Sequence, residues 1–157
     1  MQRTIVIVAL ALAAAACSKG SGKAVANLEP KSGSQTTGTV TFTDKDGKVE
    51  IVIAAKALAP GKHGVYLHEK GDCTGSNAAA VGHRFATADN PHAGDLGDLE
   101  VGADGLGNKT ITYDKGSVGP GDRSLVNRSI VISVDPDNQA LKETFGIVAC
   151  GVINPES

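Results

Sequence analysis

Residues 38–53 most narrowly limit what this chain can fold into, because their polarity alternates with a period of two on both sides of a turn signal. Residues 38–43 and 49–53 alternate apolar with polar side chains, as half-buried β-strands do. Between them, Asp44-Lys-Asp-Gly47 is a typical hairpin turn. The sequence therefore predicts an antiparallel hairpin. The apolar side chains expected on its buried face are Val40, Phe42, Val49, Ile51 and Ile53.

Further short segments read as strands, and none reads convincingly as a helix. In the segment 128–134, Ile130, Ile132 and Val134 are expected on one face. Gly supplies 20 of the 157 residues, which suits many tight turns, and the lack of Trp leaves the core to aliphatic side chains. We therefore expect an all-β antiparallel barrel or sandwich of about eight strands. The other expected strands are 24–28, 63–69, 98–101, 109–113 and 144–152, with long loops at 70–97 and 114–126.

The N-terminus has the features of an export signal. An apolar run over residues 4–16 is too short to span a bilayer, and it ends in Ala-Ala-Ala before Cys17. We expect residues 1–16 to be a lipoprotein signal peptide, Cys17 to carry lipid, residues 17–23 to be a flexible tether, and residues 24–157 to form the domain. An ordinary signal peptide cut nearby is the alternative. Either way we expect the mature chain to be exported. With lipid it would be anchored in a bacterial cell envelope, facing the periplasm, with the outer membrane as a possible location, or at the cell surface.

Cysteine count and charge add two constraints. Beyond Cys17 only Cys73 and Cys150 remain, and two cysteines in an oxidising compartment suggest one disulfide, with two free buried thiols as the alternative. The formal net charge is −2, with both signs mixed along the chain, which excludes an extended nucleic-acid-binding surface.

Six segments form one pattern when taken together. In chain order they are Gly38-Thr-Val-Thr-Phe42, Gly61-Lys-His-Gly-Val-Tyr-Leu-His-Glu-Lys-Gly-Asp72, Gly82-His-Arg-Phe85, His92-Ala-Gly-Asp-Leu-Gly97, Arg128-Ser-Ile-Val-Ile132 and Ala149-Cys-Gly-Val-Ile153. They resemble the copper/zinc superoxide dismutase family, in which Gly82-His-Arg-Phe85 is similar to a G-G-H-F segment. The resemblance implies an eight-stranded Greek-key β-barrel with two long loops, and a disulfide between Cys73 and Cys150.

The resemblance also implies which residues stand at the copper ligands. Tyr66 and Ser133 occupy the places of two copper-binding histidines, while His68 matches a third and His83 matches the histidine that bridges copper and zinc. Alternation along a strand places Tyr66 and His68 on one face. Ile147 stands where the family has an arginine that attracts superoxide. Copper binding is therefore in doubt, and no residue is assigned as catalytic.

The zinc ligands are better preserved by the same comparison. His83, His92 and Asp95 match three of the four, and they are donors that suit Zn²⁺. The fourth ligand is expected to be Asp89, His68 or water. A loop held only by hydrogen bonds is the competing interpretation.

Two further residues have a role only through the resemblance. His63 matches a structural histidine, and Asp137 matches an aspartate that lies behind the metal ligands. Both are read as supports of the site and not as ligands.

Three functions follow from these readings. The favoured one is a zinc-binding envelope lipoprotein of the dismutase family with little or no dismutase activity. A working superoxide dismutase with an altered site, converting superoxide to oxygen and hydrogen peroxide, is the second. A metal carrier or interaction scaffold is the third. The family forms dimers, so a homodimer is left open.

Overall fold

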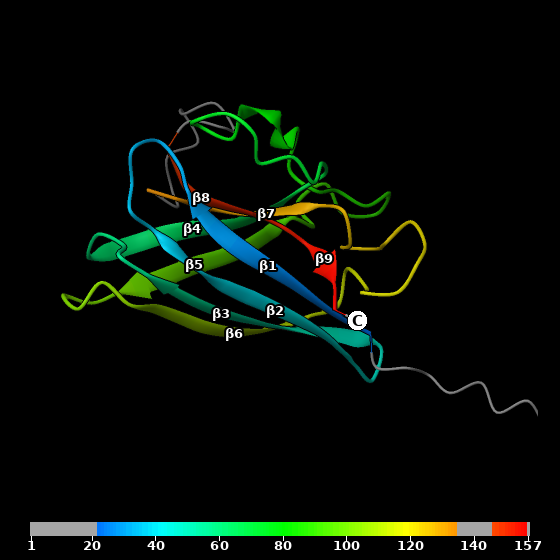
Figure 1. Cartoon of the computed structure of the whole chain (residues 1–157). Coiled ribbons are helices and arrows are strands. Elements are labelled where there is room, and N and C mark those ends of the chain that lie inside the picture. The colour runs from blue at the N-terminus through cyan, green and yellow to red at the C-terminus, as the bar shows by residue number, and fades with distance from the viewer. Residues whose placement is uncertain (1–21, 135–145, 157) are drawn as a thin grey trace, which may run out of the picture.

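The alternating segment forms the hairpin that its sequence predicts (Figure 1). This computed structural model describes residues 22–134 and 146–156. In the turn, Asp46 and Gly47 both have positive φ, of 49° and 80°, and Lys45 pairs with Lys48. Positive φ at both central residues suits the right-handed twist of the flanking strands. The expected strand-turn-strand unit is therefore confirmed.

The described residues contain nine strands and one short 3₁₀ turn. The expected strands are all present, with ends that move by no more than three residues, and residues 144 and 145 of the last expected strand lie outside the described residues. The bounds are β1 Lys23–Pro30, β2 Thr37–Lys45, β3 Lys48–Lys56, β4 Gly61–His68, η1 Ala79–Val81, β5 Asp95–Val101, β6 Gly107–Tyr113, β7 Ser129–Ser133, β8 Ile147–Val152 and β9 Asn154–Pro155.

The strands pair antiparallel in the order β5-β4-β7-β8-β1-β2-β3-β6, with β9 on β1. Consecutive β3 and β4 are not paired, nor are β6 and β7, so two connections cross the ends of the barrel. The order ends at β5 and β6, where Lys109 Nζ donates to the carbonyls of Leu96, at 3.1 Å, and Asp98, at 2.6 Å. The result is the nearly closed eight-stranded antiparallel barrel that the sequence predicts.

The core lies between two layers of strands. In Figure 1, β1, β2, β3 and β6 form one layer, and β4, β5, β7 and β8 form the other. All five apolar side chains of the hairpin are buried, as expected. The segment after β4, which includes η1, lies outside the second layer and covers the outer face of β4 (Figure 1).

One expectation about a strand face is wrong. Val134 was expected beside Ile130 and Ile132, but it lies beyond the end of β7 and is 48% exposed. A β-bulge between Ile132 and Ser133 shifts the register, so the two-residue alternation stops there.

The terminal and membrane-related predictions lie mostly outside the described residues. Cys17 and residues 1–16 fall in the undescribed segment 1–21, and β1 begins at Lys23, the last residue assigned to the tether. In the part of the chain that the structure describes, no helix has the length and apolar character needed to cross a membrane.

Candidate metal centre

Strand β4 presents its side chains alternately to the core and to the covering segment. Val65 and Leu67 belong to the main core, while Tyr66 belongs to a second apolar cluster outside the barrel. This confirms that residues 66 and 68 face away from Val65 and Leu67. The site is thus built on the outer face of β4.

Tyr66 is packed as an apolar side chain. It is 6% exposed and shares its cluster with Val81, Val131 and Ile147. Its ring also lies over Gly64, where an added Cβ would be 2.5 Å from Tyr66 Oη and 2.6 Å from Cε2. Only glycine at position 64 leaves room for this ring.

Ser133 and Ile147 lie on neighbouring strands beside Tyr66. They are register partners between β7 and β8, and both are buried. Ser133 Oγ donates to the carbonyl of Gly64 at 3.4 Å. The resemblance assigns these two positions to a copper-binding histidine and to the superoxide-guiding arginine, and they hold a hydroxyl and an aliphatic chain, both buried.

The two histidines of β4 are fixed by backbone carbonyls. His68 is fully buried, and its Nδ1 lies 2.9 Å from the carbonyl oxygen of Gly82. His63 is also buried, with Nδ1 2.9 Å from Ser133 O and Nε2 2.8 Å from Ala59 O. These contacts tie β4 to β7 and to the preceding loop, which confirms His63 as a packing and hydrogen-bonding residue.

Arg84 lies against Tyr66. Its guanidinium carbon is 3.8 Å from the centre of the Tyr66 ring, a cation–π distance. Arg84 forms an antiparallel bridge with His68, and Phe85 N donates to Leu67 O at 2.8 Å. The segment 83–85 thus continues the sheet along the end of β4.

Strand geometry explains why Arg84 turns inward and His83 outward. Residues directly opposite each other in an antiparallel pair present their side chains to the same face. Arg84 is opposite His68, so it shares a face with His68 and Tyr66, whereas His83 is exposed. Sequence reasoning missed Arg84. The signal was available, because Gly82-His-Arg-Phe85 aligned without a gap on G-G-H-F places Arg84 at the histidine.

The residues expected to hold zinc extend from the covering segment to the start of β5. His83, His92 and Asp89 lie on the covering segment, Asp95 is the first residue of β5, and all four are exposed. Within residues 22–134 and 146–156, no three His, Cys, Asp or Glu side chains gather closely enough to hold a metal ion. The structure does not bring these four residues together, so their role as ligands remains a prediction.

The carboxylates of Asp89 and Asp95 each accept a hydrogen bond that supports a local turn. Asp89 accepts a hydrogen bond from Thr87 Oγ1 at 2.7 Å, and Asp95 accepts one from Gly97 N at 2.9 Å. The bond from Thr87 holds the pKa of Asp89 below its usual value, so this carboxylate is charged at neutral pH. Asp137 lies outside the described residues.

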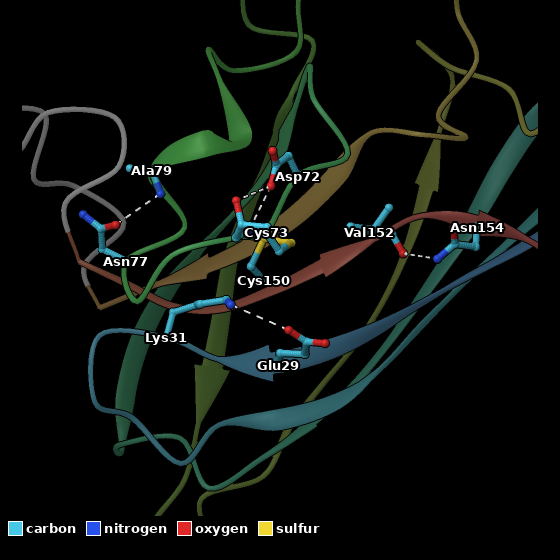
Figure 2. The surroundings of a disulfide bond; sticks show 10 residues. Glu29, Lys31, Asp72, Cys73, Asn77, Ala79, Cys150, Val152 and Asn154 are labelled. Carbon is cyan, nitrogen blue, oxygen red and sulfur yellow. Dashed lines mark hydrogen bonds and ion pairs between the residues drawn. A yellow bond between two sulfur atoms is a disulfide. The ribbon is translucent and has the colours of Figure 1, made fainter.

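A disulfide anchors the covering segment to β8 (Figure 2). Cys73 and Cys150 are bonded, with their Cα atoms 5.7 Å apart, as the sequence predicts. Asp72 accepts hydrogen bonds from the backbone N of Thr74 at 2.9 Å and from its Oγ1 at 2.6 Å, which fixes the turn that carries Cys73. Both cysteines belong to the second apolar cluster, together with Tyr66.

Comparison with protein families gives one match. The family model described as copper/zinc superoxide dismutase (SODC) matches residues 36–153, well over half of the chain. The matched region runs from the start of β2 to the end of β8 and includes the disulfide and the whole covering segment.

Proposed function

This chain belongs to the copper/zinc superoxide dismutase family, and from that premise we propose that it is an envelope lipoprotein with little or no dismutase activity. One observation carries the proposal. The side chains at the positions of a copper ligand and of the guiding arginine, Tyr66 and Ile147, are packed together in one buried apolar cluster. A metal centre that exchanges an anion with solvent needs an open polar site. Here the corresponding space is filled by the packed side chains of Tyr66 and Ile147.

The donors present do not fit copper. Dismutation needs a metal that cycles between two oxidation states, which copper held by imidazoles provides. The buried side chains that stand at the copper-ligand positions by resemblance are the phenol of Tyr66, the hydroxyl of Ser133 and the imidazole of His68. A phenol has an ordinary pKa of about 10, so it would have to lose a proton before it could ligate a metal at neutral pH. We therefore derive no copper chemistry for this chain.

The exposed loop fits zinc by donor type. His83, His92, Asp95 and Asp89 offer two imidazoles and two carboxylates, which are zinc donors. We propose that they take up zinc by drawing the loop 83–95 together, with His68 as the alternative fourth ligand. Zinc has no second accessible oxidation state, so it would order the loop and would not carry electrons.

The test measures metal content and dismutation on one preparation. The full chain carrying Cys17→Ser is exported to a periplasm, purified and dialysed against a mild chelator, and copper and zinc are counted by elemental mass spectrometry. About one zinc per chain and no copper is expected. Asp95→Asn should lose the zinc, and Asp122→Asn, an exposed carboxylate outside the loop, should keep it.

Three results would contradict this reading. Tightly held copper with dismutation above that of free-metal controls would establish the working dismutase. Absence of both metals would remove the zinc proposal and favour an interaction scaffold, and weak, readily exchanged metal would favour a carrier.

Lipid attachment has its own test. We propose that residues 1–16 are removed and that Cys17 is lipidated, on the basis of the small residues before it and the polar segment after it. Mass spectrometry of the N-terminal peptide should show a diacylglyceryl adduct on Cys17, and Cys17→Ser should release the protein from membranes. An unlipidated N-terminus at another position would show an ordinary signal peptide instead.

A further inference from the structure

We propose that the guanidinium of Arg84 takes the place of the family's metal ion, as a built-in cation that holds the covering segment on Tyr66 and closes the site to copper. The proposal deepens the proposed function and rests on it, because it assigns what occupies the position that a metal has lost. Three features of the described residues carry it.

The first feature is the placement of the charge. The Arg84 guanidinium carbon lies 3.8 Å from the centre of the Tyr66 ring, which is the residue at a copper-ligand position. The bridge to His68 sets Arg84 on the same face as both β4 side chains. The positive group therefore lies on the Tyr66 ring, on the face of β4 that would otherwise meet a metal.

The second feature is the enclosure of the arginine. Its Nε is buried and makes no hydrogen bond to any other described residue. Burying part of a cation is unfavourable unless something offsets it. The negative face of the Tyr66 ring is the offsetting group that the structure shows. An arginine that only decorates an exposed loop can keep all of its guanidinium nitrogens in water, whereas Arg84 keeps its Nε buried.

The third feature is the backbone around the pair. Glu69 N donates to His83 O at 3.0 Å, and Phe85 N donates to Leu67 O at 2.8 Å, so hydrogen bonds on both sides fix the position of Arg84. The room for the Tyr66 ring depends on Gly64. The backbone on both sides of Arg84 is thus tied to β4, and the charge that it places on Tyr66 would repel Cu²⁺.

A double-mutant cycle in the presence of a chelator tests the interaction. Arg84→Met and Tyr66→Leu, alone and together, are compared by urea unfolding of the full chain. The expected coupling is about 2- to 30-fold in the unfolding equilibrium constant, the range of a cation–π contact. Tyr66→Phe keeps the ring face, so Arg84→Met should cost as much in the Tyr66→Phe background as in the unmodified chain. This comparison remains available if Tyr66→Leu does not fold, and a clearly smaller cost in the Tyr66→Phe background would place the interaction on the hydroxyl and overturn the ring contact.

The neighbouring residue gives the matched control. His83→Ala lies one position away on the same segment but faces outward, so it should show no coupling to Tyr66. Coupling of Arg84 to Tyr66 no larger than that of His83 would overturn the proposal. That result would not bear on dismutase activity, whereas copper-dependent dismutation by the unmodified chain would overturn the proposed function.

Restoration of copper ligands tests the closure of the site. Tyr66→His with Ser133→His returns two imidazoles, and Arg84→His is then added. Equilibrium dialysis and electron paramagnetic resonance should show Cu²⁺ bound at least about tenfold more tightly when Arg84 is replaced, because a fixed positive charge is removed and an imidazole gained. Equal affinity with and without Arg84 would show that the guanidinium does not exclude copper.

Discussion

Reduction of the disulfide between Cys73 and Cys150 is expected to lower the free energy of unfolding by about 4.5 kcal/mol. The two cysteines are 77 residues apart in sequence, so the bond closes a loop of about half of the chain. In the chain-entropy treatment, a loop of this length restricts the unfolded chain by about 4.5 kcal/mol at 25 °C, as an upper value. Whole domains are stable by only about 5–15 kcal/mol, so the bond supplies a large part of the total.

The structure allows the covalent contribution to be separated from packing. Cys73 and Cys150 are buried in the cluster that also contains Tyr66, Val81 and Ile147. In the reduced chain the two sulfur atoms must separate to van der Waals distance, but both thiols stay in the cluster as small apolar groups. Reduction therefore tests mainly the cross-link, whereas Cys73→Ala with Cys150→Ala also removes two sulfur atoms and should cost more.

The assay is urea unfolding of the oxidised protein, the reduced protein and the double alanine variant. With a slope of about 2 kcal/mol/M, the expected shift of the midpoint on reduction is about 2 M. Whole curves are needed, because loss of the cross-link expands the unfolded chain and changes the slope. A loss smaller than about 1 kcal/mol on reduction would refute the loop-entropy reasoning and show that packing alone holds the covering segment.

Three further outcomes follow from single side chains. Burial raises the pKa of Tyr113 to about 12, above its unfolded value of about 10, so the stability from this group is present below pH 10 and lost as pH rises toward 12. Tyr113→Phe should therefore make the urea midpoint fall less between pH 9 and pH 12. At pH 7 it should lower the free energy of unfolding by about 1 kcal/mol, because it removes the hydrogen bond that the hydroxyl donates to Ala93 O at 2.8 Å. Gly64→Ala should destabilise the chain by about 1–3 kcal/mol through overpacking against Tyr66, and most of that loss should disappear in a Tyr66→Leu background, as chemical denaturation of both pairs would show. Leu67→Ala, at a fully buried core position, should cost about 2–5 kcal/mol, and a loss below 1 kcal/mol would place that side chain outside the core.

The strands were predictable because the order of polar and apolar residues in each strand depends on which of its faces is buried. A strand with one face on the core must alternate, so Val40, Phe42 and Ile51 could be assigned to the interior without knowledge of their partners. Turn residues set the register in the same local way at Asp46 and Gly47. The prediction failed for Val134, where a bulge depends on how β7 meets β8 and leaves no mark in the alternation.

The candidate site was only partly predictable. The disulfide was assigned correctly, because with Cys17 reserved for lipid only one pair of cysteines remained. The burial of Tyr66 and Ile147 in one cluster could not be read from their neighbours, since it depends on a covering segment that returns from elsewhere in the chain. Arg84 was missed because its direction follows from its bridge to His68, and pairing is a tertiary property.

The sequence by itself determined the family and the antiparallel barrel, because motif residues and two-residue alternation are local properties. Only the tertiary structure decided which side chain packs on Tyr66. Whether a loop residue faces Tyr66 or solvent depends on which residue of β4 lies opposite it, and that register set Arg84 inward and His83 outward. A shift of one residue in register exchanges the two faces of a strand. The same sequence with that shift would have turned the His83 imidazole toward Tyr66 and the Arg84 side chain toward solvent.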